Sequence, residues 1–129
     1  MKKFKPMLLV MIAAFLMFSF SSNAFAANKV NVVKNEYETL VKSERVYTDG
    51  ETVEVTPYMM AAGEANVFVL FVDAETDEEM LVSQIVFTPQ MNGVGITTYH
   101  KIHRPGYYYL IIGGDTNAYI VATLKKLDY

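Results

Sequence analysis

The chain has 129 residues, no cysteine and a formal net charge of −3. The lack of thiols excludes a disulfide framework, a thiolate metal site, a cysteine nucleophile and a lipid-anchored cysteine. The acidic balance disfavours a nucleic-acid partner or an anionic lipid surface, because both require a clustered basic face.

The first 26 residues have the pattern of a secretory signal peptide. Three lysines precede an apolar run from Met7 to Phe18. As a helix this run rises about 1.5 Å per residue, too short for the roughly 30 Å hydrocarbon core of a bilayer. Small residues at Ala24 and Ala26 match a cleavage site, so we expect a cut after Ala26. The product, residues 27–129, is then a secreted, extracellular single domain without a membrane anchor, and its net charge is about −6 because Lys2, Lys3 and Lys5 leave with the signal.

The first part of the mature chain is expected to contain a β-hairpin. Residues Arg45–Thr48 and Glu51–Thr56 flank Asp49-Gly50, which is a preferred type I′ connection because both positions tolerate positive φ. Pro57 cannot donate to a ladder and therefore marks the end or the edge of the second strand. The preceding segment, Asn35–Glu44, fits a short amphipathic helix as well as a strand.

The middle of the chain alternates apolar runs with turn signals. The run Val67–Val72 is apolar on both faces and predicts a central strand. Asp73–Glu79 is a polar connection to a strand over Met80–Thr88, which Pro89 ends. A further strand is expected over Ile96–Ile102. Arg104-Pro105-Gly106 then predicts a turn that ends this region.

The C-terminal part predicts a second hairpin, with Tyr107–Ile112 and Tyr119–Leu124 joined by the loop Gly113–Asn117. No stretch of twelve or more residues has a helical period. The sequence therefore predicts an all-β fold, a small antiparallel β-sandwich, jelly-roll-like, of about six to eight strands.

One family resemblance follows from this order of strands. The features are a strand ending in Thr52-Val53-Glu54-Val55, a loop, and the run Val67–Val72 closing on Asp73. They continue with Pro105-Gly106-Tyr107-Tyr108-Tyr109-Leu110-Ile111-Ile112, followed by Tyr119-Ile120-Val121-Ala122. Over roughly residues 45–124 the chain resembles the bacterial pre-peptidase C-terminal (PPC) domain. The resemblance implies a small secreted β-sandwich, usually appended to an extracellular enzyme, and it assigns no functional residue.

Two histidines and two serines are the candidates for catalysis in the mature chain. His100 and His103 lie three residues apart, so a continuous strand would send them to opposite faces. Neither Ser43 nor Ser83 lies in a Gly-x-Ser-x-Gly elbow. A small secreted hydrolase, or an accessory domain of one, that uses His100 or His103 with acids of the Asp73–Glu79 loop is the alternative function. It requires these groups to converge in a concave site.

The acidic loop raises the question of calcium. Asp73, Glu75 and Asp77 occupy alternate positions, as in the start of a calcium loop. An EF-hand is excluded because Glu78 stands where glycine is needed and Gln84 where the bidentate glutamate should be. Two interpretations remain, namely a looser calcium site joined by Asp115 or Asn117, and a solvated turn without any cofactor.

Tyrosine is the most informative residue type. In a strand, Tyr107 and Tyr109 share one face, and Tyr119 is expected on the partner strand of the same hairpin, with Tyr99 and Tyr58 extending the set. A sheet face that carries tyrosines suits stacking on sugar rings or anchoring a protein. The alternative is that tyrosine fills cross-strand pairs as an ordinary strand residue.

Together these patterns predict a secreted, non-catalytic binding or interaction protein that acts through a tyrosine-bearing sheet face. The expected partner is cell-wall glycan, another secreted protein, or a second copy of the chain joined through an edge strand. The two-sided apolar runs Val67–Val72 and Tyr107–Ile112 favour self-association, because a small sandwich normally leaves one side of each sheet in water.

Overall fold

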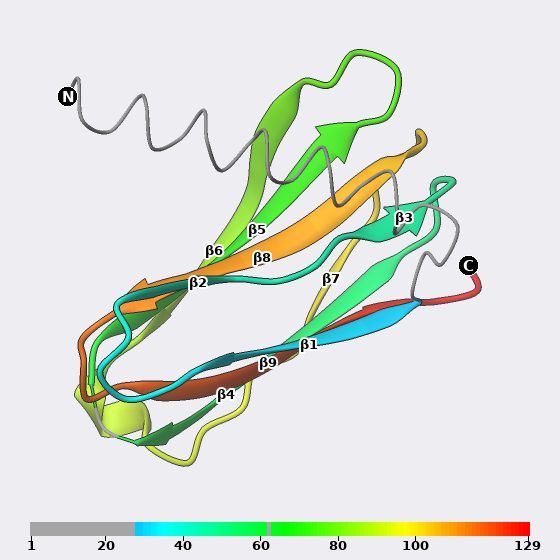
Figure 1. Ribbon diagram of the computed structural model, residues 1–129. Helices are drawn as coiled ribbons and strands as arrows, with labels where there is room; N and C mark the ends of the chain where they lie inside the picture. Colours follow the sequence, from blue (N-terminus) through cyan, green and yellow to red (C-terminus); the bar gives the residue numbers. More distant parts are fainter. Residues whose placement is uncertain (1–27, 62) are drawn as a thin grey trace, which may run out of the picture.

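The computed structural model describes residues 28–61 and 63–129, and the predicted signal peptide and its cleavage site lie outside them. Two antiparallel sheets are stacked face to face (Figure 1). The four-stranded sheet has the order β1-β9-β4-β7, with bounds Lys29–Lys34, Tyr119–Lys126, Val53–Ala61 and Thr98–His100. The five-stranded sheet has the order β2-β8-β5-β6, and β3 also pairs with β8. Its strands are β2 (Leu40–Lys42), β8 (Gly106–Gly114), β5 (Ala65–Asp73), β6 (Glu79–Phe87) and β3 (Val46–Thr48).

The core lies between the two sheets. Alternate residues of each long strand point inward, because successive side chains of a strand lie on opposite faces. Examples are Val53 and Val55 of β4, Val67 and Val69 of β5, and Leu110 of β8, all fully buried. The predicted all-β sandwich is therefore confirmed. In the described residues it has nine strands, more than expected, because β1 was not predicted and the ambiguous segment Asn35–Glu44 supplies β2.

The predicted hairpin around Asp49-Gly50 is wrong. β3 pairs with β8 in one sheet, whereas β4 pairs with β7 and β9 in the other, so the chain crosses between sheets at this point. Gly50 has a φ of +110°, but Asp49 is not among the residues with positive φ. A type I′ turn needs positive φ at both positions, and the connection therefore does not reverse the strand within its own sheet.

The second predicted hairpin is wrong for the same reason. β8 joins the five-stranded sheet between β2 and β5, and β9 joins the four-stranded sheet between β1 and β4. The two strands were correctly located, but the loop between them connects the layers. Tyr119 therefore does not share a sheet with Tyr107 and Tyr109.

Pro57 lies inside β4 and does not end it. The strand continues to Ala61, and Pro57 is opposite Ala122 of β9. The carbonyl of Pro57 accepts a hydrogen bond from Ile96 N–H at 3.0 Å, so the backbone groups of Pro57 are directed away from β9. The missing N–H of the proline thus falls on the side of the irregular segment before β7, and the β4–β9 ladder loses no hydrogen bond.

Most of the remaining predictions from the middle of the chain are confirmed. β5 lies between β8 and β6 and covers the predicted central strand, and β6 ends just before a 3₁₀ turn at Pro89–Met91. β7 is shorter than the expected Ile96–Ile102. In the part of the chain that the structure describes, no helix is long and apolar enough to cross a bilayer.

Candidate binding faces

The two histidines do not form a shared site with the acidic loop. His100 lies on β7 opposite Val53, and its Nε2 is 2.9 Å from Thr98 Oγ1. Burial lowers the pKa of His100, and no carboxylate contributes to that shift. His103 is exposed in the bend that follows β7. Across residues 28–61 and 63–129, no group of three His, Asp or Glu side chains is arranged to hold a metal.

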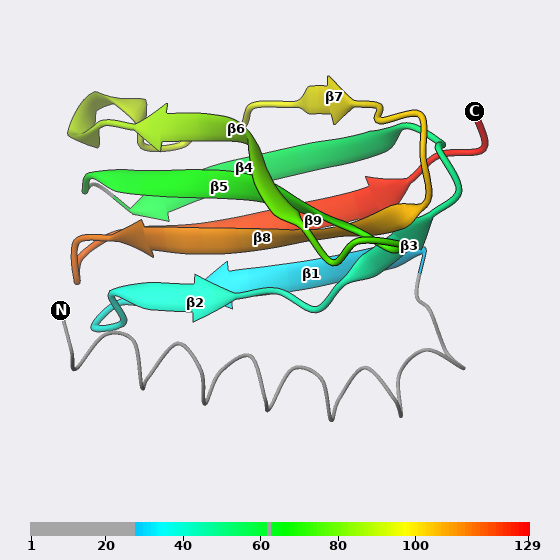
Figure 2. The ribbon, with the colours of Figure 1, turned by 90° about the horizontal axis from the view of Figure 1, so that it is seen from above.

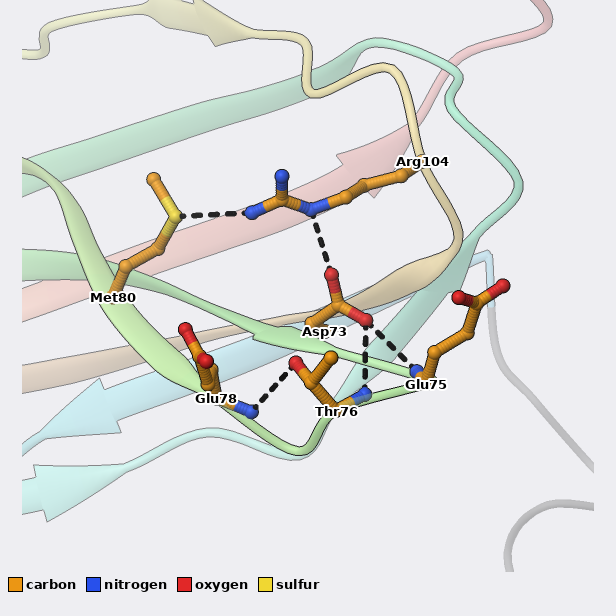
Figure 3. Close-up of polar contacts among 6 residues, drawn as sticks. All are labelled: Asp73, Glu75, Thr76, Glu78, Met80 and Arg104. Carbon is orange, nitrogen blue, oxygen red and sulfur yellow. Dashed lines mark hydrogen bonds and ion pairs between the residues drawn. The ribbon is translucent and has the colours of Figure 1, made fainter.

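The acidic loop is closed by its own first residue (Figure 3). Asp73 Oδ1 accepts hydrogen bonds from the backbone N–H groups of Glu75 at 2.8 Å and Thr76 at 3.2 Å, and Arg104 Nε lies 2.7 Å from Asp73 Oδ2. These bonds, led by that from Glu75, lower the pKa of Asp73. The carboxylate that would begin a calcium site is thus already used to hold the β5–β6 turn.

Asp115 and Asn117 cannot join Asp73, Glu75 and Asp77. Asp73 is opposite Gly106 at one end of β8, whereas Asp115 follows Gly114 at the other end. At 3.3 Å per residue, eight steps along β8 separate the two ends by about 26 Å. Asp115 and Asn117 are therefore too far away to complete a calcium site in the acidic loop.

Tyr107 and Tyr109 lie on the outer face of the five-stranded sheet, as their shared parity predicted. The Tyr107 ring packs edge to face on Tyr47, with the ring centroids 5.2 Å apart. Tyr109, however, is only 3% exposed. Lys42 and Arg45 lie over its ring at 5.2 and 5.8 Å, and its hydroxyl donates a hydrogen bond to Glu79. The Tyr109 ring is therefore covered by protein and cannot stack on a ligand, contrary to the prediction for this residue.

Tyr58 lies on the outer face of the four-stranded sheet, with its ring fixed against a glycine. Gly95 forms an isolated bridge with Tyr58, and a Cβ added at Gly95 would be 3.0 Å from Tyr58 Cδ2. The absence of a side chain at Gly95 lets one side of the ring rest there. The residue nevertheless remains 42% exposed, so the rest of the ring faces solvent.

Tyr99 is on the same outer face, beside an acidic side chain. It is opposite Glu54 in the β4–β7 register. The charge of Glu54 is the largest cause that raises the pKa of Tyr99. Because the residue is 59% exposed, its ring is open to solvent over most of its area.

Hydroxyl and amide groups form a row between these two rings. Thr56 of β4 is opposite Thr123 of β9, which in turn is opposite Asn31 of β1. Thr123 Oγ1 donates to Asn31 Oδ1 at 2.9 Å, and Thr56 Oγ1 lies 3.4 Å from Thr97 Oγ1. The row crosses the whole sheet and offers hydrogen-bonding groups on a flat surface.

Tyr119 extends the same face. It lies on β9 two residues before Val121, which is opposite Tyr58. This makes Tyr119 and Tyr58 diagonal neighbours, at about 7–8 Å between their Cα atoms. Tyr58 is four residues from Glu54, so Tyr58 and Tyr99 are about 13 Å apart along the strands. Of the four tyrosines predicted to bind, Tyr99 and Tyr119 thus share a face with Tyr58, and Tyr107 and Tyr109 lie on the opposite one.

Comparisons with known proteins show a distant structural likeness. No family model matches the chain, and no curated protein matches it, so the PPC resemblance stays a prediction. One similar structure is the CBM22-1 xylan-binding domain from Paenibacillus barcinonensis Xyn10C (11% identity, 80% of this chain and 84% of that chain, TM-score 0.45). Another is the CBM22-1–GH10 module of Clostridium thermocellum xylanase 10B complexed with xylohexaose (14%, 79% and 26%, 0.47). A third is the Yersinia pseudotuberculosis-derived mitogen (4%, 78% and 86%, 0.45).

Proposed function

We propose that this chain is a secreted, non-catalytic binding module that holds a glycan chain on the outer face of its four-stranded sheet. The observation that carries the proposal is the pair of exposed rings on one face, Tyr58 resting against Gly95 and Tyr99 opposite Glu54. A ring already held in place, as Tyr58 is, loses little conformational entropy when a ligand stacks on it. Both tyrosines offer an open ring to the C–H face of a sugar.

The residues between the rings favour a sugar over an apolar partner. Thr56, Thr97, Thr123 and Asn31 place hydroxyl and amide groups where the hydroxyls of a sugar would lie. Lys125 and Glu54, opposite one another in register, border this row with charge. An apolar protein surface would have to desolvate these groups without replacing their hydrogen bonds, which carries a free-energy cost.

The test is retention by insoluble cell-wall polysaccharide, measured by depletion of the protein from solution. We expect Tyr58→Ala and Tyr99→Ala each to weaken binding roughly fivefold, for a stacking contact of about 1 kcal/mol. The double variant should lose most of the retention, with an unchanged circular dichroism spectrum.

A matched control is the most exposed tyrosine outside this face. Tyr37 is 87% exposed in the turn between β1 and β2 and has a φ of +75°. Tyr37→Asn suits that backbone conformation and removes the ring. Binding should be unchanged in this variant. Retention that survives the double variant, or that falls equally in the control, contradicts the proposal.

A further inference from the structure

Among the described residues the two sheets have five edge strands, because β2 and β3 pair in succession with the same side of β8, and four of them are protected against pairing with another chain. β2, β3 and β7 have only three residues each. β1 begins with the exposed Lys29 and ends with Lys34, which points inward and donates hydrogen bonds to the carbonyls of Asp115 and Ala118. Short strands, lysines and inward-pointing charges are means by which proteins prevent edge-to-edge association. The fifth edge, β6, has none of these features between Met80 and Phe87.

β6 is a nine-residue strand at the end of its sheet (Figure 2). Its sequence from Met80 to Phe87 contains no charged residue and no proline. Leu81 and Val86 are each 54% exposed on its outer side. A long, uncharged and apolar edge strand presents unpaired backbone groups and therefore favours pairing with a further strand.

A bulge limits the part of β6 that can pair. The register with β5 shifts between Val69 and Leu70, opposite Leu81–Ser83. Such a bulge bends the strand and interrupts its alternation. Beyond it, Ser83–Phe87 alternates regularly, with Gln84 and Val86 outward and Ile85 and Phe87 buried in the core.

We propose that two copies of this chain pair antiparallel through the Ser83–Phe87 edge of β6, so that their five-stranded sheets become one continuous sheet. In this symmetric arrangement the unpaired backbone N–H and C=O groups of each edge find hydrogen-bond partners on the other copy. Outward-facing side chains of one copy lie opposite outward-facing side chains of the other. The dimer contact is thus isologous and closed.

The charges of the chain favour a second copy in this orientation. An acidic cluster, Glu75, Asp77, Glu78 and Glu79, lies at the N-terminal end of β6 and in the turn before it. Antiparallel pairing places the two acidic turns at opposite ends of the contact, beyond a Debye length of each other. Parallel pairing would put them side by side and would be opposed by like-charge repulsion.

The arrangement has a geometric consequence that rests on the proposed function. The two-fold axis of an antiparallel edge pair runs perpendicular to the joined sheet. Both four-stranded sheets then lie on the same side of the dimer, and the tyrosine faces of the two copies point in the same direction. The dimer becomes a bivalent module for a polymer with repeated sites.

The experiment is sedimentation velocity on the protein purified after expression of the full 129-residue sequence. The concentration series reaches about 1 mM, which detects even a transient contact. We expect a dimer for the unmodified chain and a monomer for Val86→Lys and for Gln84→Lys. Position 86 of one copy is opposite position 84 of the other, so the two lysines of either variant would be diagonal neighbours across the paired edges, about 7–8 Å apart, and would repel each other. Circular dichroism verifies that each variant is folded, and the exposed position of both side chains makes this the expected result.

The matched control is Leu40→Lys, which places the same charge at a 60% exposed apolar position on the opposite edge of the same sheet. This variant should remain a dimer. A monomer throughout the series for the unmodified chain, a dimer that survives both β6 variants, or a dimer lost in Leu40→Lys would each overturn the proposal. Glycan is absent from the measurement, so the result does not depend on the proposed function.

Discussion

Gly95 determines how the Tyr58 ring lies. The ring contacts the glycine backbone so closely that an added Cβ would be 3.0 Å from Cδ2. A larger side chain must displace the ring from its place. We expect Gly95→Val to weaken glycan binding about fivefold, comparable with loss of one stacking contact. Isothermal titration with a soluble oligosaccharide measures the change.

Gly113→Ala is the control for this prediction. Gly113 and its register partner Leu40 lie on the five-stranded sheet, away from the Tyr58 face. A Cβ added at Gly113 would be 3.4 Å from Leu40 Cδ1, an ordinary distance that a flexible side chain accommodates. Its binding should equal that of the unmodified chain. An unchanged dissociation constant for Gly95→Val would show that the ring position has no role in binding.

The buried tyrosines predict a loss of stability at alkaline pH. Burial raises the pKa of Tyr108 to about 12, and burial followed by the hydrogen bond to Glu79 raises that of Tyr109. The unfolded chain releases these protons near pH 10 and the folded chain retains them, so the free energy of unfolding falls as the pH rises above 10. The expected slope is up to about 1.4 kcal/mol per pH unit for each group.

Urea denaturation between pH 8 and 11.5 measures this slope. Tyr108→Phe has no proton to lose, so its curve should be flatter than that of the unmodified chain by the contribution of Tyr108 alone. Parallel curves for the two proteins would show that the hydroxyl of Tyr108 ionises equally in the folded and unfolded states.

Among the elements, the β5–β6 turn is stabilised from within. Asp73 accepts two backbone hydrogen bonds and pairs with Arg104, and all three interactions are independent of a metal (Figure 3). We therefore expect the melting temperature to be the same in millimolar calcium and in chelator. Scanning calorimetry tests this expectation, and a rise with calcium would contradict it.

The same turn gives an acid-dependent contribution. Because the pKa of Asp73 is lowered in the folded state, its stabilising effect is present above its ordinary pKa and is lost as the pH falls through the lowered value. Asp73→Ala should lower the melting temperature at pH 7 and should differ less from the unmodified chain in strong acid. An equal difference at both pH values would assign the effect to packing.

The positions of the five longest strands were predictable from sequence, whereas their pairing, and the strand β1, were not. Period-two alternation and turn residues are local signals, and they located β4, β5, β6, β8 and β9. Whether a connection reverses within a sheet or crosses to the other depends on which partner buries both apolar faces of the strand. Gly50 is therefore a turn residue as predicted, but the strand that follows it joins the opposite layer.

The candidate site shows the same division between local and long-range information. Parity along β8 correctly placed Tyr107 and Tyr109 on one face. The burial of Tyr109 was not predictable. Lys42, which covers its ring, belongs to the segment that the sequence left open between helix and strand, and Arg45, at the start of a predicted strand, reaches the ring only through a long-range pairing. Tyr58 and Tyr99 meet on one face only through the β4–β7 register, which is likewise a long-range pairing.

At the level of the whole molecule, the two outer faces differ in chemistry. One carries the threonine row and the exposed tyrosines, and the other ends at the apolar edge of β6. The two surfaces are on separate sheets, so a glycan and a second copy can be bound at the same time. In the proposed dimer, two sites on one polymer would add avidity to the affinity of each single site.

The last prediction separates affinity from avidity. Val86→Lys leaves Tyr58, Tyr99 and the threonine row unchanged, so its dissociation constant for a short soluble oligosaccharide should equal that of the unmodified chain. On insoluble polysaccharide, where both copies of a dimer can bind one surface, the variant should be retained at least about tenfold less tightly. Titration calorimetry and depletion assays give the two numbers, and Leu40→Lys should match the unmodified chain in both. Equal loss in both assays would place Val86 in the sugar site, and equal retention would mean that the paired copies do not present their tyrosine faces to the same surface.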